Sequence, residues 1–159
     1  MPVRTAAGTK VYIGPATTEA TDTVAEFSAI TWTEIGGVTA LPEYGDESAA
    51  VTSTDLGTAR VRKGKGARDA GTATLTVNND PADAGQQALV TAEGTNFVYP
   101  FRVVYPDRPA PGGTDTEEFF RGIVRSKRRG GGDVNSVMTR VFIVDVDSQI
   151  YEKPATTGV

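Results

Sequence analysis

Short runs of alternating apolar and polar residues, separated by turn-forming residues, are the feature that most constrains this fold. The run Gly71–Val77, GTATLTV, places Ala73, Leu75 and Val77 on one face, which is the pattern of a half-buried strand. Phe97–Tyr105, FVYPFRVVY, is the most apolar alternation in the chain. Weaker runs occupy residues 10–13, 30–38, 116–127 and 136–146. Regular strands with turns between them predict an antiparallel β-sandwich or barrel.

The positions of a few large or rigid residues refine this prediction. Pro100 interrupts the most apolar run, so we expect that strand to lie at a sheet edge or to contain a bulge. Trp32, the only Trp, is expected to anchor the core at a sheet edge. In the last two runs apolar residues occupy both faces, as with Phe119 and Phe120, so these strands should be buried twice. A neighbouring subunit or a helix of the same chain would serve as the second cover.

One helix is predicted over residues 81–93. Asp80 suits the N-cap, Pro81 suits the first helical position, and Gly94 supplies a C-terminal stop. Small residues form a stripe that can lie close against a sheet, at Ala84, Ala88, Leu89 and Ala92. The predicted fold is therefore mainly β: an antiparallel β-sandwich or barrel with one flanking α-helix and a long hairpin arm.

The arm is the stretch of residues 41–70, which lies between strand signals but has little apolar periodicity. Loops beyond roughly 12 to 15 residues are uncommon in compact domains unless they are functional or disordered. Its first half carries acidic residues, Glu43, Asp46, Glu47 and Asp55, and its second half carries basic ones, Arg60, Arg62, Lys63, Lys65 and Arg68. Folded back as a hairpin, it would have an acidic and a basic edge, and neighbouring copies could dock head to tail into rings or filaments. The alternative is a disordered, solubilising loop.

Composition excludes several classes of function. The 159 residues suit a single domain, 1–159, with flexible ends at about 1–8 and 152–159. The formal net charge of −4 argues against a general nucleic-acid binder. The chain has no Cys and no His, and it contains no catalytic or metal-binding motif. We therefore predict no enzyme activity, no metal and no cofactor.

Neither a signal peptide nor a membrane anchor is expected from the sequence. The N-terminal segment MPVRTAAGTK lacks an apolar run, and no segment approaches the ~18 apolar residues that span a bilayer. We expect a protein that is made in, and first retained in, a cytoplasm.

A second basic run precedes a glycine-rich turn near the C-terminus, at Arg121, Arg125, Lys127, Arg128 and Arg129. Residues 121, 125, 127 and 129 are predicted to share one strand face. Such a face could hold phosphate by charge. The alternatives are a solvated hairpin end or a contact with acidic residues of a neighbour.

Three segments together resemble the major tail tube proteins of long, non-contractile-tailed bacteriophages. They are Ile35–Val38 (IGGV) before the acidic turn, Lys65–Asp69 (KGARD) closing the arm, and Asn79–Gln86 (NDPADAGQ) opening the helix. The resemblance extends from about Lys10 to Ile150. None of these segments is a catalytic motif, so the resemblance depends on their combined order.

The resemblance implies a structural virion protein that forms stacked hexameric rings of a tail tube, a conduit for DNA during ejection. It implies assembly in the host cytoplasm, location in the tail, and partners such as tape measure and terminator proteins. Contacts between subunits or rings are expected at Glu43, Tyr44, Asp46, Glu47, Arg60, Arg62, Lys63, Lys65 and Arg68. The second basic run is expected at a subunit or ring contact away from the lumen. The alternatives are a monomeric DNA-binding β domain and a ring-forming tail terminator.

Overall fold

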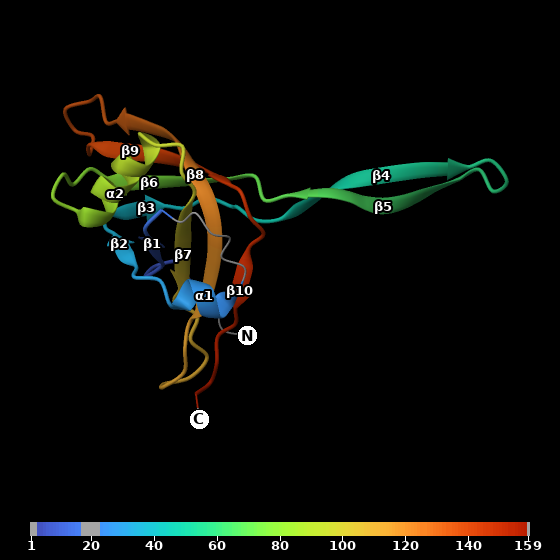
Figure 1. Cartoon of the computed structure of the whole chain (residues 1–159), viewed down its shortest axis with the longest axis horizontal. Coiled ribbons are helices and arrows are strands. Elements are labelled where there is room, and N and C mark those ends of the chain that lie inside the picture. The colour runs from blue at the N-terminus through green and yellow to red at the C-terminus, as the bar shows by residue number, and fades with distance from the viewer. Residues whose placement is uncertain (1–2, 17–22, 159) are drawn as a thin grey trace.

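A curled antiparallel sheet forms the body of the molecule in a computed structural model that describes residues 3–16 and 23–158 (Figure 1). The strands run in the order β2-β1-β7-β8-β9-β6-β3, and β10 pairs with the free side of β8. Their bounds are β1 (Lys10–Ile13), β2 (Thr33–Ile35), β3 (Val38–Ala40), β6 (Thr72–Asn78), β7 (Tyr99–Tyr105), β8 (Thr116–Gly130), β9 (Thr139–Val146) and β10 (Tyr151–Lys153). The mainly β prediction is confirmed.

The core lies on the concave face of this sheet and follows the alternation of the sequence. Leu75 of β6 pairs with Phe142 of β9, and Val11 of β1 pairs with Val103 of β7. All four side chains are buried, with at most 3% of their surface exposed. The strands expected from residues 10–13 and 71–77 are thus confirmed, because alternation leaves each of them one apolar face to bury.

The prediction for β7 was wrong in two respects. Phe97 lies before the strand and is 60% exposed. The strand is internal, between β1 and β8, although it contains Pro100. The Gly14 N–H donates to the Pro100 carbonyl (3.0 Å), just beyond the end of β1 at Ile13. The N–H and C=O groups of one strand residue point to the same side. The side on which Pro100 lacks an N–H therefore faces the segment beyond the end of β1, where no strand needs that hydrogen bond.

Helix α2 (Ala84–Glu93) begins later than predicted. Its N-cap is Asp83 rather than Asp80, and Gly94 is the C-cap as expected. Oδ2 of Asp83 accepts from the N–H of Gln86 (2.9 Å) and from that of Gly36 (3.1 Å), so the cap also binds the β2–β3 turn. With 10 residues α2 is the longest helix of the described part of the chain, and none there is long and apolar enough to cross a bilayer.

Helix α2 contacts β2 through its first turn. A Cβ on Gly85 would lie 2.3 Å from the Glu34 carbonyl oxygen, so only glycine allows this approach. Gln86 is 2% exposed, and its Nε2 donates to the carbonyls of Gly36 (2.9 Å) and Asn78 (2.8 Å). Its Oε1 accepts from the Asp80 N–H (3.0 Å). The buried face therefore includes Gly85 and Gln86 and leaves out Ala84, which was expected there.

The outer face of β8 is covered by a short second helix, α1 (Val24–Ser28), that the sequence did not predict. Phe27 stacks on Phe119 with ring centres 5.4 Å apart and lies 5.3 Å from the ring of Tyr151. Trp32 donates from Nε1 to the Phe27 carbonyl (3.1 Å) and lies half-buried beside Phe119, so it packs on the outer face and not in the core where it was expected. At Phe119 the second cover is therefore part of the same chain.

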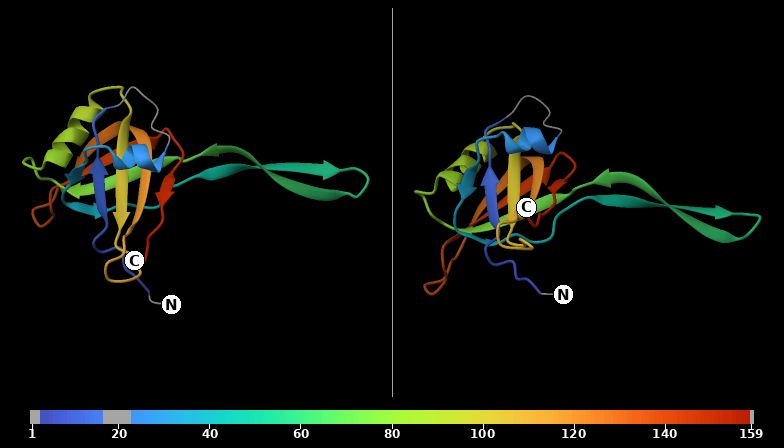
Figure 2. Two further views of the ribbon diagram at one scale, coloured as in Figure 1. Left: turned by 60° about the horizontal axis from the view of Figure 1, so that its bottom comes forward. Right: turned by 90° about the horizontal axis from the view of Figure 1, so that it is seen from below.

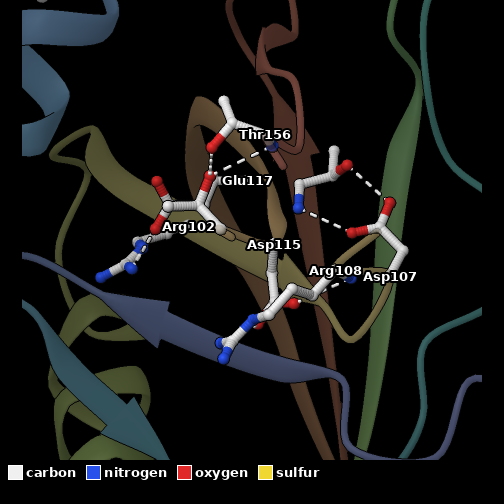
Figure 3. A network of polar contacts seen from close by, with 8 residues as sticks. Arg102, Asp107, Arg108, Asp115, Glu117 and Thr156 are labelled. Carbon is white, nitrogen blue, oxygen red and sulfur yellow. Dashed lines mark hydrogen bonds and ion pairs between the residues drawn. The ribbon is translucent and has the colours of Figure 1, made fainter. Parts of the chain in front are cut away.

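Polar contacts hold the C-terminal segment and the loop before β8 (Figure 3). Asp107 accepts from the N–H (2.7 Å) and the hydroxyl (2.5 Å) of Thr116, and these bonds lower the pKa of its carboxyl. Thr156 forms an isolated bridge with Thr114. In the segment from residue 152 onward, Glu152 and Lys153 pair with β8, and Thr156 pairs with Thr114 in the loop before it.

Replacing Gln86 by Leu should lower the free energy of unfolding by about 2 to 4 kcal/mol, because two carbonyls and one N–H would lose their buried partner. Urea denaturation measures this change. Gln87→Leu, at the exposed neighbouring position, is the matched control and should change stability by less than ~1 kcal/mol. Equal effects of the two substitutions would contradict the role given to Gln86.

Candidate functional site

A two-stranded hairpin projects from the body as a separate sheet, formed by β4 (Glu47–Asp55) and β5 (Arg60–Asp69) (Figures 1 and 2). All its residues are exposed except Ser48 and Gly66, which are half-buried. The predicted hairpin is confirmed. An isolated two-stranded ribbon is at best marginally stable in water, so this arm is the part of the molecule that most needs a partner.

The tip of the arm is a defined turn that presents an apolar side chain. The Asp55 carbonyl accepts from the Ala59 N–H (2.8 Å), and its Oδ1 accepts from the Gly57 N–H (2.9 Å). Ala59 has a φ of 52°, a left-handed conformation that closes the turn. Leu56 is fully exposed there, and Val51 and Val61 along the arm are 51% and 53% exposed.

Charge is distributed unevenly between the two strands. All five cations of the arm belong to β5. The β4 strand is charged only at its ends, Glu47 and Asp55, with the uncharged stretch SAAVTST between them. The predicted acidic edge is therefore reduced to two positions, and most of the acidic residues gather where the arm joins the body.

Strand register places two of the cations on one face of the ribbon. Lys63 pairs with Thr52, and Lys65 pairs with Ala50. Directly opposite residues share a face, so this surface, which we call the lysine face, carries two cations beside small neutral side chains. No acidic residue lies on it between Thr54 and Ala50.

The other face, which we call the arginine face, has mixed charge. Arg60 pairs with Asp55, and Arg62 pairs with Ser53. The sequence analysis treated all the arm cations as one set. Alternation along a regular strand separates positions 60 and 62 from 63 and 65, once the strand is known to run without a bulge between them.

Tyr44 points into the body of its own chain, although the sequence suggested a contact between subunits. Its hydroxyl donates to Oε2 of Glu118 (2.6 Å) and lies 2.7 Å from the hydroxyl of Tyr105. Its ring lies 5.6 Å from that of Phe120. Burial and the bond to Glu118 raise the pKa of Tyr44, and burial raises that of Tyr105. Tyr44 therefore fixes the base of the arm to β7 and β8.

Among the hollows that flank the base of the arm, two have three acidic lining residues each. One, of about 540 Å³, is lined by residues that include Glu43, Asp46 and Glu47. The other, of about 350 Å³, is lined by residues that include Asp46, Asp69 and Asp147. Asp46 is bound within the chain, because its Oδ2 lies 3.5 Å from a guanidinium nitrogen of Arg68 and 3.4 Å from the Ile150 N–H.

The second basic run does not form one face, contrary to prediction. A bulge follows Val124, so that Ser126 becomes the next paired residue and Arg125 is left between them. Lys127 then lies opposite Phe142 on the core side and pairs with Glu93 of α2 (3.3 Å). One inserted residue reverses the alternation of every later position.

The remaining charges of this run are partly neutralised within the chain. Arg125 donates from Nε to Asp145 (2.7 Å). Arg128 and Arg129 are exposed near the β8–β9 turn, and no acidic side chain of the described ranges forms an ion pair with either. Among residues 3–16 and 23–158 no three acidic side chains converge as metal ligands would.

Comparison with known proteins gives one family and several related folds. The family model for the phage tail tube protein, TTP, matches residues 8–150. The SPP1 tail tube structure is 16% identical, covers 92% of this chain and 76% of its own, and has a TM-score of 0.64. No curated protein sequence matches.

Two further structures share the fold. The sheath/tube terminator of an extracellular contractile injection system, PVC, is 10% identical over 96% of this chain and 97% of its own, with a TM-score of 0.68. A chain from the virion of a native gene transfer agent particle is 17% identical over 77% and 88%, with a TM-score of 0.57. At these identities the likeness concerns the fold alone.

The contacts of Tyr44 predict a loss of stability in alkali. Its pKa and that of Tyr105 are raised above the unfolded value of about 10, so stability is full below that pH and falls as the pH rises above it. Tyr44→Phe should lower the free energy of unfolding by ~1 kcal/mol at neutral pH. It should also make the free energy of unfolding fall less steeply as the pH rises above about 10. Urea denaturation at about pH 8 and about pH 11 measures both effects. Tyr151→Phe is the control, and an unchanged slope in Tyr44→Phe would contradict the assignment.

Proposed function

The chain belongs to the phage tail tube protein family, and from that premise we propose that copies of it assemble into stacked hexameric rings that conduct DNA. The protein would assemble in the host cytoplasm and then reside in the tail of the virion. Its other partners would be tail proteins such as a tape measure protein and a terminator. We propose no catalytic role.

The exposed arm is the observation that carries this proposal. Its two strands bury no core of their own, and its three large apolar side chains are at least half exposed. Neighbouring copies would supply the missing burial. We propose that Glu43, Asp46 and Glu47 at the base, and the five cations of β5, carry contacts between copies. Tyr44 would act by fixing the direction of the arm.

Charge distribution supports a role as a conduit. From Glu47 to Asp69 the arm has five cations and three acidic residues, a charge of +2, so the rest of the chain carries −4 − 2 = −6. An acidic wall would let DNA pass, because it offers phosphates no counterion-releasing contact. We place Arg128 and Arg129 at a subunit contact away from the lumen, as the sequence suggested.

A tail terminator is the second candidate, favoured by the structural match to a tube terminator over nearly the whole of both chains. Length of assembly distinguishes the two, because a terminator stops at one ring and a tube protein continues. A monomeric DNA-binding domain has less support, since the bulge in β8 divides its basic run between two faces.

Removal of the arm should abolish tubes and leave the body folded. Glu47 and Asp69 are opposite each other, so residues 48–68 can be replaced by an Asn-Gly hairpin turn. Negative-stain electron microscopy of the concentrated wild-type protein should show hollow tubes, and the variant should show none. Circular dichroism and urea denaturation are the controls for folding. Normal tubes from the shortened chain would refute the role of the arm, and dispersed wild-type particles would count against the tube itself.

A further inference from the structure

We propose that the lysine face of the arm docks on the base of the arm of a second copy. This inference builds on the proposed function and narrows it to one face of the arm and one receiving surface. The receiving surface, which we call the acidic root, consists of the two hollows at the base and their acidic side chains, Glu43, Glu47, Asp69 and Asp147.

The lysine face has charge without a partner. Lys63 and Lys65 are exposed, and in the described part of the chain no carboxylate lies within ion-pair distance of either. Their opposite neighbours Thr52 and Ala50 are short, so both ammonium groups can approach a flat or hollow surface. Lysine is a compact point charge on a flexible stem, which suits entry into a hollow.

The arginine face differs in carrying an acidic residue beside its cations, although neither Arg60 nor Arg62 forms an ion pair among the residues described. Asp55 lies directly opposite Arg60 and offsets part of the positive charge. The Asp55 carboxylate also accepts a hydrogen bond that holds the tip turn, which fixes it in place. A negatively charged partner would therefore be attracted more strongly to the lysine face, although both faces carry two cations.

The acidic root has an excess of negative charge, which complements the lysine face. Arg68, a cation that lines one of these hollows, already contacts Asp46 (3.5 Å). Glu43, Glu47, Asp69 and Asp147 have no ion-pair partner among the residues described. The hollows of about 540 Å³ and 350 Å³ lie against these carboxylates, so the surface combines negative charge with room for side chains.

Only a second copy can bring the two surfaces together. Lys63 and Lys65 are six and four residues from Asp69 along one strand, about 20 Å and about 13 Å at ~3.3 Å per residue. The arm extends away from the body in every view (Figures 1 and 2), and neither lysine forms an ion pair with a carboxylate of its own chain among the residues described. A contact between two different surfaces on identical chains repeats from copy to copy, as the proposed stacked assembly requires.

Two variants with equal change of charge test the choice of face. Lys63→Glu with Lys65→Glu alters the lysine face, and Arg60→Glu with Arg62→Glu alters the arginine face of the same strand. We expect the first pair to raise the concentration needed for sedimentable tubes by about tenfold or more, since attraction becomes repulsion at two sites. The second pair should raise it less than about threefold. Equal impairment by both pairs would overturn the face assignment and leave the role of the arm intact.

Charge reversal at the root provides the rescue. Glu43→Lys with Glu47→Lys should impair assembly alone and restore it when combined with Lys63→Glu and Lys65→Glu. Neither root residue contributes to the buried core, so both variants are expected to fold. Rescue would support the pairing. Failure of the combination, with each pair folded by circular dichroism, would overturn the acidic root as the receiving surface.

Cross-linking gives a measurement that does not depend on mutations. Equal amounts of unlabelled and ¹⁵N-labelled wild-type protein are mixed at assembly concentration and treated with a carbodiimide, which joins lysine to carboxylate. Mixed-isotope peptides that join Lys63 or Lys65 to the acidic root would support the proposal. Tubes whose links join other sites would overturn it and leave the tube function standing. Absence of both tubes and mixed-isotope links would count against both.

Discussion

Three consecutive residues of β8 hold the main parts of the molecule together. Phe120 faces the core and stacks on Phe101 at 5.4 Å, whereas Phe119 faces outward and stacks on Phe27 at the same distance. Glu118, the residue before them, accepts a hydrogen bond from the hydroxyl of Tyr44. One strand, buried on both faces, thereby joins the sheet core, the outer helix and the base of the arm, so the direction of the arm is tied to the body.

This arrangement separates a body that has a hydrophobic core from an arm that has none. The body buries both aromatic faces of β8 within one chain, although Phe97, Val137 and Met138 stay exposed. The arm has no such layer, and exposed ion pairs contribute only about 0.2 to 1 kcal/mol each. In the proposed assembly, the arm would therefore draw on many repeated weak contacts and on burial of its apolar side chains between copies. Such contacts favour assembly only when many copies are present.

Sequence reasoning succeeded where the signal is local. Alternation located β1 and β6, Gly94 located the end of α2, and the unpatterned, charged stretch located the hairpin. It missed α1, since five residues are too few to show a helical period. It placed the N-cap of α2 at Asp80 because Asp80 and Asp83 both suit that position. Contact with Gly36 favours Asp83, and that contact spans 47 residues.

The sequence by itself determined the class of fold, the position of the arm and the lack of Cys and His chemistry, because these depend on neighbouring residues and on composition. Tertiary structure alone decided where the important side chains point. Tyr44 turns inward because Glu118, 74 positions later, lies beneath it. The cations of β8 separate at a bulge, because the bulge is a feature of the pairing with β9 and not of the spacing of the cations themselves.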